Sequence, residues 1–383
     1  MIPNYGNEQF SESIYLNNEP EPSEETKQKL KNPFDNPTEY LDYREDYSKV
    51  LPWLKMPDYK LPFEPARTEK KILKRSYSIG GSCVVLHFIT SQVAALLLML
   101  LIQLIIKALN PGVDSEDISD YMSYSSILSS INMLIYLTAN VLFAGLGLKW
   151  AKIKSKNLFK PLEFNLTYAV EYCLIGLALW NVSAYISTFI EYIFQSMGYS
   201  SIVESFADNE LSPLGNAVMN IYSCIIAPIT EEIFYRGMVL KVFSKANQRF
   251  AIFASAFLFG LGHGNIPQFA LAFTVGIFFA HITLKHNSIV PSIIVHVCIN
   301  SFATLTSLLS SSAVGSGIIF IFTIAATIIG LLLLLMFRKK DRLPATTPAQ
   351  TRRGFAIAKT SATFVLSICL LIISTIFNTM FLT

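Results

Sequence analysis

Two glutamates and an arginine interrupt a long apolar stretch of this chain, in the sequence 227-APITEEIFYRGMV-239. Residues four positions apart share one face of a helix, so Glu232 and Arg236 are expected to form an ion pair. Glu231 points about 100° away from Glu232 and is left to face another part of the protein. A purely structural reading is an ion pair that locks the helix against its neighbours. The adjacent, unpaired Glu231 favours a reactive carboxylate, with Glu232 and Arg236 supporting it.

Two further polar motifs follow on later apolar segments. His263 ends the sequence FGLGH, in which two glycines permit close helix approach. His296 and Asn300, in HVCIN, are four residues apart, which places an imidazole and a carboxamide on one helix face. Glu231, His263 and His296 each lie roughly 12 to 20 Å along their helices from the same predicted membrane surface, at 1.5 Å per residue. One shared site near the middle of the membrane is therefore feasible.

This set of side chains is suited to hydrolysis. We expect Glu231 and His263 to hold and deprotonate a water that attacks a peptide carbonyl. His296 and Asn300 would donate hydrogen bonds to the oxyanion that develops. A zinc-held water is an open alternative, with Glu231, His263 and His296 as ligands, because two histidines and one glutamate match a catalytic zinc site. A serine nucleophile is less favoured, since the chain contains no GxSxG elbow, and no HExxH motif is present either.

The elements that position these residues are predicted to be membrane helices. The chain is 52% hydrophobic and 15% charged, against about 25% charged residues in a soluble domain. Apolar runs long enough to approach or cross the hydrocarbon core recur at about 82–107, 127–148, 166–194, 214–240, 250–264, 267–285, 289–310, 314–337 and 355–380. The sequence thus predicts an all-α polytopic transmembrane helix bundle with eight or nine spanning helices.

Two of these spans need comment. The fifth is short and is separated from the sixth only by the helix-breaking tetrapeptide at 264–267, so the two are expected to form a tight hairpin within the membrane. The last span is amphipathic in places. It either crosses the membrane or lies in its interface, which leaves eight crossings as an alternative to nine.

Residues 1–75 are predicted to form a polar, Pro-rich, extended cytoplasmic tail, and residues 76–383 the transmembrane domain. The first 68 residues hold 13 acidic and 8 basic side chains and 9 of the 17 prolines, a composition typical of a poorly packed segment. Lysine and arginine gather before the first span and after the second, fourth and eighth, which favours a cytoplasmic N-terminus. Isolated polar residues in the spans are expected to serve bundle packing; they are His87, Glu171, Glu191 and His281.

The three motifs EExxxR, FxxxH and HxxxN, in this order on successive membrane helices, resemble the CPBP family. This is the group of CAAX prenyl endopeptidases of the Ras-converting type and of bacteriocin-processing enzymes. The matching positions are Glu231, Glu232, Arg236, Phe259, His263, His296 and Asn300, within a core of about 165–310. The resemblance implies an intramembrane endopeptidase in which Glu231 and His263 activate the water and His296 and Asn300 stabilise the oxyanion. The family has been described both as metalloendopeptidases and as glutamate-dependent enzymes, so zinc stays open.

Other functions remain alternatives at this stage. The same polar cluster is compatible with a non-catalytic membrane protein, such as a bacteriocin immunity protein or a scaffold for a partner. A proton-coupled transporter is less favoured, because the sequence shows no evident inverted repeat. The expected partners are the lipid bilayer and a peptide or protein substrate in the plasma membrane. A net charge of +3 gives no reason to expect nucleic acid.

Overall fold

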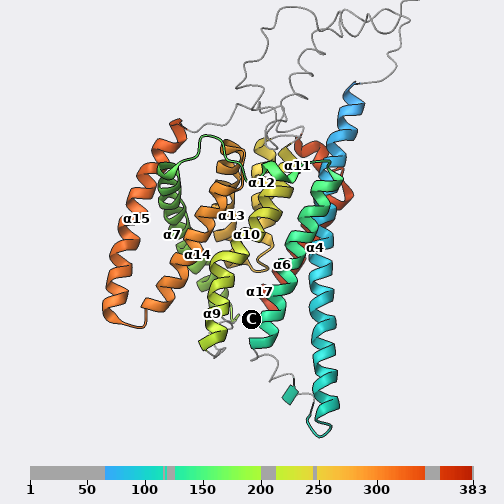
Figure 1. Ribbon diagram of the computed structural model, residues 1–383, viewed down its shortest axis with the longest axis vertical. Helices are drawn as coiled ribbons and strands as arrows, with labels where there is room; N and C mark the ends of the chain where they lie inside the picture. The colour runs from blue at the N-terminus through green and yellow to red at the C-terminus, as the bar shows by residue number, and fades with distance from the viewer. Residues whose placement is uncertain are drawn as a thin grey trace, which may run out of the picture.

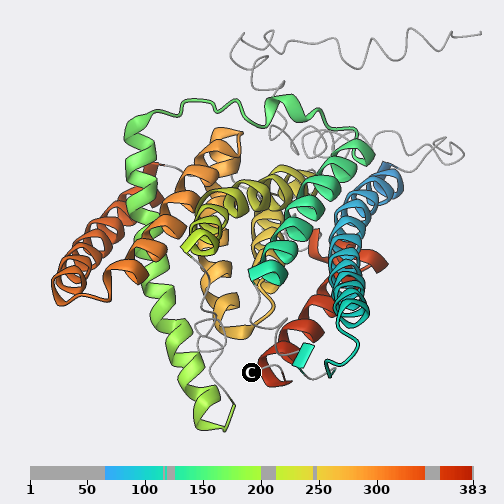
Figure 2. The same cartoon turned by 60° about the horizontal axis from the view of Figure 1, so that its bottom comes forward.

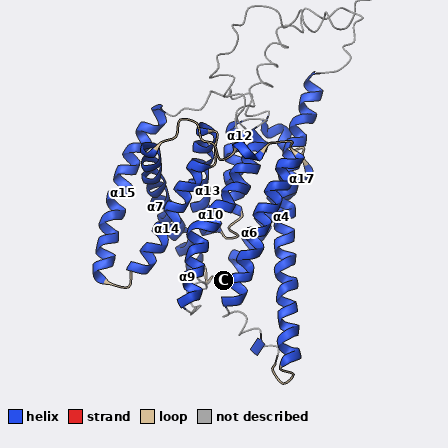
Figure 3. Cartoon of the chain, in the orientation of Figure 1, coloured by secondary structure: helices blue, strands red, loops and turns tan. Residues whose placement is uncertain are grey.

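The computed structural model describes residues 65–114, 117–118, 126–199, 213–244, 248–340 and 354–381. Every regular element in these ranges is a helix, and none is a strand (Figure 3). The all-α prediction is therefore confirmed. The helix α4 begins at Pro65, ten residues before the predicted end of the tail; residues 1–64 of that tail lie outside the described residues.

The helices follow the order of the predicted spans. They are α4 (Pro65–Leu109), α6 (Ser126–Trp150), α7 (Leu166–Ser196), a composite fourth helix, α12 (Gln248–Leu261), α13 (Ile266–His286), α14 (Val290–Leu309), α15 (Ala313–Lys340) and α17 (Ala362–Phe381). The composite helix runs through α9 (Pro213–Ile221), η2 (Tyr222–Ile226), α10 (Ala227–Glu232), η3 (Ile233–Leu240) and α11 (Lys241–Ser244). A short 3₁₀ turn, η1 (Ser155–Asn157), lies between α6 and α7.

Eight helices of the described chain are long and apolar enough to cross a membrane, and α12 is shorter. This confirms the prediction of eight or nine membrane-spanning helices. Large apolar side chains are exposed along the outer faces of these helices, for example Leu104 on α4 and Ile321 and Leu335 on α15. Such surfaces are stable when they face lipid rather than water. The chain is therefore an integral membrane protein.

The fourth helix departs from α-helical geometry on both sides of the two glutamates. The π-helical segment η2 ends two residues before Pro228. Proline lacks an N–H group and clashes with the carbonyl four residues earlier, so the preceding turn widens. A second π-helical segment, η3, carries Arg236. Single π-helical turns are rare and occur often at functional sites.

The fifth and sixth predicted spans form the expected hairpin, α12 and α13. Gly264 adopts a φ of 75° in the connecting turn, a conformation that favours glycine. The Asn265 side chain caps α13 by accepting a hydrogen bond from the backbone N–H of Gln268 at 2.9 Å. The turn lies at a level between the two ends of α4 and α6 (Figure 1). The hairpin thus holds the loop residue His263, whose side chain is exposed, at this level of the bundle.

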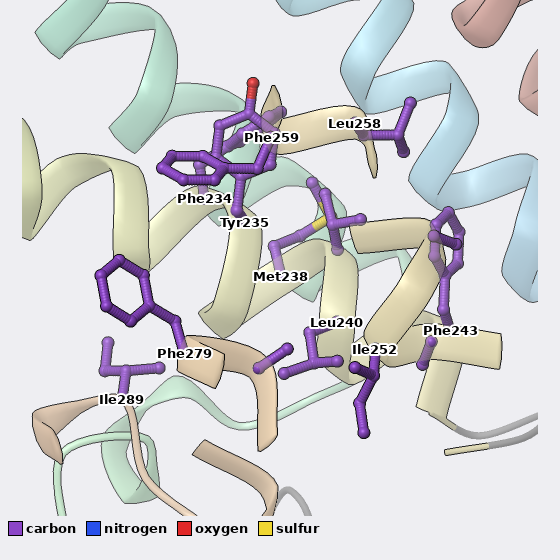
Figure 4. Close-up of a cluster of buried hydrophobic side chains, with 14 of the residues drawn as sticks. Phe234, Tyr235, Met238, Leu240, Phe243, Ile252, Leu258, Phe259, Phe279 and Ile289 are labelled. Carbon is purple, nitrogen blue, oxygen red and sulfur yellow. The ribbon is translucent and has the colours of Figure 1, made fainter. Parts of the chain in front are cut away.

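The bundle has one edge on each side of this hairpin. α15 packs against α7 at one edge, and α17 packs against α4 at the other, as Figures 1 and 2 show. Between them the composite helix, α12, α13 and α14 enclose the core. Buried aromatic side chains of η3 and α12, among them Phe234, Tyr235 and Phe259, cluster at its centre (Figure 4). Arg236, His263 and His296 of the candidate site contact the Phe259 ring of this cluster.

Candidate active site

The ion pair expected from the sequence is present. The Arg236 guanidinium donates from Nη1 to Glu232 Oε1 at 2.9 Å, and both side chains are fully buried. It also donates from Nη2 to the backbone carbonyl of Gly276 on α13 at 3.2 Å. Its Cζ lies 4.2 Å from the ring centroid of Phe259 and 5.2 Å from that of Phe279, which adds cation–π attraction. One charged side chain thereby ties the fourth helix to α12 and α13.

Gly276 makes this arrangement possible. A Cβ atom at this position would lie 3.1 Å from both Arg236 Nη2 and Phe259 Cδ1. That separation is tighter than ordinary van der Waals contact, so a larger residue would push the guanidinium away from its carbonyl acceptor. The sequence gives no signal for this role, because α13 contains no polar motif at this point.

His296 on α14 bridges the two glutamates. Its Nδ1 lies 3.1 Å from Glu232 Oε1, and its Nε2 lies 3.8 Å from Glu231 Oε2. A carboxylate only accepts hydrogen bonds, so Nδ1 carries the proton that it donates to Glu232. The ring is held from a third side by Phe279, with the ring centroids 5.0 Å apart. His296 and Asn300 lie one turn apart on α14, and the carboxylates of Glu231 and Glu232 are polar neighbours of the imidazole.

The two glutamates have different surroundings. Glu232 is fully buried and shares one oxygen between Arg236 and His296. The Glu231 side chain keeps 27% of its surface exposed, and its 3.8 Å approach to His296 exceeds hydrogen-bond length. Glu231 is therefore the carboxylate that has room for a further partner, such as a water.

His263 lies in the turn after α12. Its Nδ1 lies 2.9 Å from the Phe259 carbonyl oxygen, which can only accept, so Nδ1 donates and Nε2 holds a lone pair. The Phe259 ring contacts both histidines edge-on, with centroids 4.9 Å from His263 and 5.8 Å from His296. In the described part of the chain no direct bond joins His263 to Glu231. Phe259, part of the FxxxH motif, is the spacer that sets the relative position of the two imidazoles.

The Asn300 side chain is hydrogen-bonded to the composite helix. Its side-chain N–H donates to the backbone carbonyl of Ser223 in η2 at 2.8 Å. The carbonyl of Ser223 lies within the π-helical segment that precedes Pro228. This bond ties α14 to the composite helix and leaves the second N–H of the carboxamide for another acceptor.

The proposed zinc ligands do not converge on one point. The Nδ1 of His296 donates to a carboxylate and the Nδ1 of His263 donates to a carbonyl, as in histidines that bind zinc through Nε2, so the fit depends on whether the three side chains are grouped. Within the described ranges, no three His, Cys, Asp or Glu side chains are grouped closely enough to hold a metal ion. The residues Glu231, His263 and His296 in this arrangement therefore do not fit the zinc centre considered from the sequence.

One segment of the chain is similar in sequence to known membrane peptidases. Residues 213–302 match the family described as "Type II CAAX prenyl endopeptidase Rce1-like". A segment of 92 residues is 30% identical to the Bacillus subtilis (strain 168) protein named "Putative membrane peptidase YdiL". That match covers 24% of this chain and 38% of the length of that relative. None of the solved structures matches the chain.

These matches confirm the resemblance drawn from the three motifs. The matched segment lies inside the expected core of 165–310 and contains all six candidate site residues. It begins at the composite helix and ends within α14. The helices α4, α6, α7, α15 and α17 lie outside it.

Proposed function

From the Rce1-like segment at residues 213–302, we propose that this protein is an intramembrane endopeptidase with Glu231 as its general base. The observation that carries the proposal is the division between the two glutamates. Glu232 is buried and engaged by Arg236 and His296, whereas Glu231 stays partly exposed at the edge of the same cluster. A hydrolytic site needs one carboxylate that is held in place and yet accessible to water.

The reaction follows from this division. Glu231 takes a proton from a water whose oxygen attacks the carbonyl carbon of the peptide bond. The lone pair on His263 Nε2 accepts the second hydrogen of that water and so orients it. The protonated Glu231 then delivers its proton to the departing amide nitrogen as the C–N bond breaks. Glu231 returns to the carboxylate, which balances the reaction.

Oxyanion stabilisation falls to His296 and Asn300. Asn300 has one side-chain N–H left after its bond to Ser223. His296 donates its Nδ1 hydrogen to Glu232. To donate to the oxyanion as well, the ring must carry a second proton, on Nε2. Removal of one oxyanion donor typically costs about 10²–10³ in kcat.

The substrate class follows from where the site lies. The cluster belongs to helices buried in the bundle of an integral membrane protein, so the substrate is a peptide bond of a membrane-associated or lipidated peptide. The same proposal places the enzyme in the plasma membrane with its N-terminus in the cytoplasm, as the distribution of lysine and arginine favours.

The test is cleavage by the purified protein in nanodiscs. The probes are quenched fluorescent peptides, one set ending in a prenylated CAAX sequence and a second set with the same sequences unmodified. Cleavage by the wild-type protein and its loss in Glu231→Ala would support the proposal, and full cleavage by Glu231→Ala would refute it. EDTA is expected to leave the rate unchanged, because the three residues considered as zinc ligands do not converge.

A further inference from the structure

A second polar feature lies beside the candidate site. A cavity of about 100 Å³ adjoins the turn between α12 and α13, and His263 is part of its wall. The other polar lining residues are His87, Ser91 and Gln92 on α4, Tyr136 on α6, Tyr235 on η3, and Ser374 and Asn378 on α17. The lining contains no Asp, Glu, Lys or Arg side chain. Most of these residues belong to helices outside the segment that matches the Rce1-like family.

His87 is held in place on this cavity by a hydrogen bond and by a stacked aromatic ring. Its Nε2 lies 2.9 Å from Asn140 Oδ1 on α6, and its ring stacks on Phe234 with centroids 4.7 Å apart. Asn140 in turn donates to Thr230 Oγ1 at 3.3 Å, next to Glu231 in the sequence. The sequence assigns His87 only to bundle packing. The structure places it at the end of a polar chain that connects α4 and α6 to the helix of the two glutamates.

The α17 wall is fixed to the same turn. Thr379 Oγ1 accepts a hydrogen bond from the backbone N–H of Ile266 at 3.1 Å, and Thr375 Oγ1 donates to the Leu261 carbonyl at 3.3 Å. A Cβ added at Gly264 would lie 3.1 Å from Asn378 Nδ2. Hydrogen bonds thus join α17 directly to the turn between α12 and α13, so these two walls of the cavity are fixed relative to each other.

The uncharged polar side chains of the lining indicate what kind of molecule the cavity binds. Neutral polar side chains inside a membrane bundle are costly unless hydrogen-bonded partners reach them. A water molecule occupies about 30 Å³ and bonds to two to four polar groups, so the cavity has room for about three waters. The uncharged lining does not suit an ion.

We propose that this cavity is a water-binding chamber that supplies His263 with the water consumed in hydrolysis. The inference rests on the proposed endopeptidase function, because each peptide bond cleaved requires one water at a site within the membrane-spanning bundle. The chamber stands next to the histidine whose Nε2 is open, so a water bound there needs no further opening of the bundle to reach it. The helices α4 and α17 then contribute to catalysis although they lie outside the matched segment.

The occupancy of the chamber is measured without any substrate. X-ray hydroxyl-radical footprinting in nanodiscs modifies buried side chains that contact bound water. We expect modification of His87 and Tyr235, which are only 9% and 7% exposed, at clearly higher rates than of Tyr77, which is 0% exposed in the core. Equal, negligible rates at all three would overturn the proposal. Because this readout does not depend on activity, it can fail or succeed independently of the endopeptidase proposal.

Filling the chamber tests its link to catalysis. Ser374→Leu places a larger apolar side chain in the cavity. Cys369→Leu is the matched control on the same helix, because Cys369 lines a separate apolar cavity of about 400 Å³ between α12 and α17. Ser374→Leu is expected to protect His87 from footprinting and to lower kcat about tenfold with KM unchanged. Cys369→Leu should keep the wild-type footprint and rate.

Other outcomes identify a different occupant. If Ser374→Leu raises KM and alters the preference among peptides that differ at a single residue, the cavity binds a substrate side chain and the water proposal is wrong. If Ser374→Leu does not fold, Asn378→Leu fills the same cavity from one turn further along α17. Protection of His87 without any loss of kcat in either variant would also refute a supply role.

Discussion

Exchange of each glutamate for glutamine separates the roles that the structure suggests for them. Glu231→Gln keeps the size and shape of the side chain but removes its ability to take a proton. Loss of a general base typically lowers the rate about 10²–10⁴-fold. Because this side chain is 27% exposed and its contact with His296 is 3.8 Å long, the change in unfolding free energy should stay within about 0.5 kcal/mol.

Glu232→Gln is expected to lower the unfolding free energy more than the cleavage rate. It removes the negative charge that lies 2.9 Å from Arg236 and 3.1 Å from His296. Breaking a buried ion pair from one side costs about 3–5 kcal/mol, since the remaining charge is left uncompensated. Glutamine keeps an oxygen that accepts from Arg236, so we expect a loss at the lower end, about 3 kcal/mol. The surviving folded protein should keep part of its cleavage activity.

Both variants are measured beside the wild-type protein in the same nanodiscs. Initial cleavage rates report turnover, and intrinsic fluorescence during heating reports stability. Glu171→Gln is the matched control, because this glutamate lies on α7 and takes no part in the cluster of Glu231, Glu232 and His296. It should leave both measurements close to the wild-type values.

The opposite pattern would refute this reasoning. If Glu232→Gln is stable but inactive while Glu231→Gln cleaves normally, the roles of the two glutamates are exchanged and Glu232 is the general base. If both variants cleave at the wild-type rate and only stability falls, the cluster is structural. That result would favour the non-catalytic alternative of an immunity or scaffold protein.

Three further predictions concern residues around the cluster. Gly276→Ala should lower stability by about 1–3 kcal/mol, because its Cβ would crowd Arg236 Nη2 at 3.1 Å; unchanged thermal unfolding would contradict the tight approach of α13. Asn300→Ala should reduce kcat about 10²–10³-fold with little change in KM if the carboxamide binds the oxyanion, whereas a purely structural bond to η2 predicts a loss of stability at normal kcat. Thr379→Val removes the acceptor for the Ile266 N–H and should lower kcat by displacing the His263 turn. Thr379→Ser should restore it, and equal activity of the valine and serine variants would show that this contact does not position the turn.

Local patterns in the chain predicted a large part of the fold. The length and apolar character of each run set the membrane helices, because a helix must satisfy its own backbone hydrogen bonds in lipid. The breaker at 264–267 marked the hairpin of α12 and α13 because glycine and proline act on the backbone of their immediate neighbours. Helix α4 nevertheless begins at Pro65, ahead of the predicted boundary, since composition alone marks the end of a tail only approximately.

In the candidate site, too, the sequence predicted contacts within one helix but not contacts between helices. The pairing of Glu232 with Arg236 follows from a spacing of four residues, which is a property of a single helix and needs no knowledge of other elements. The same spacing in His296 and Asn300 did not predict their partners. His296 turns to the two carboxylates and Asn300 to the Ser223 carbonyl, because those partners come from another helix.

What the sequence determined by itself is therefore the set of helices and the chemical character of three motifs. Only the tertiary structure decided that Phe259 separates the two histidines, that Gly276 admits the guanidinium, and that the wall beside His263 comes from α4 and α17. The physical reason is that contacts between helices depend on how their side chains interdigitate in three dimensions. Spacing along one helix constrains which face a residue occupies, but not which neighbour meets that face.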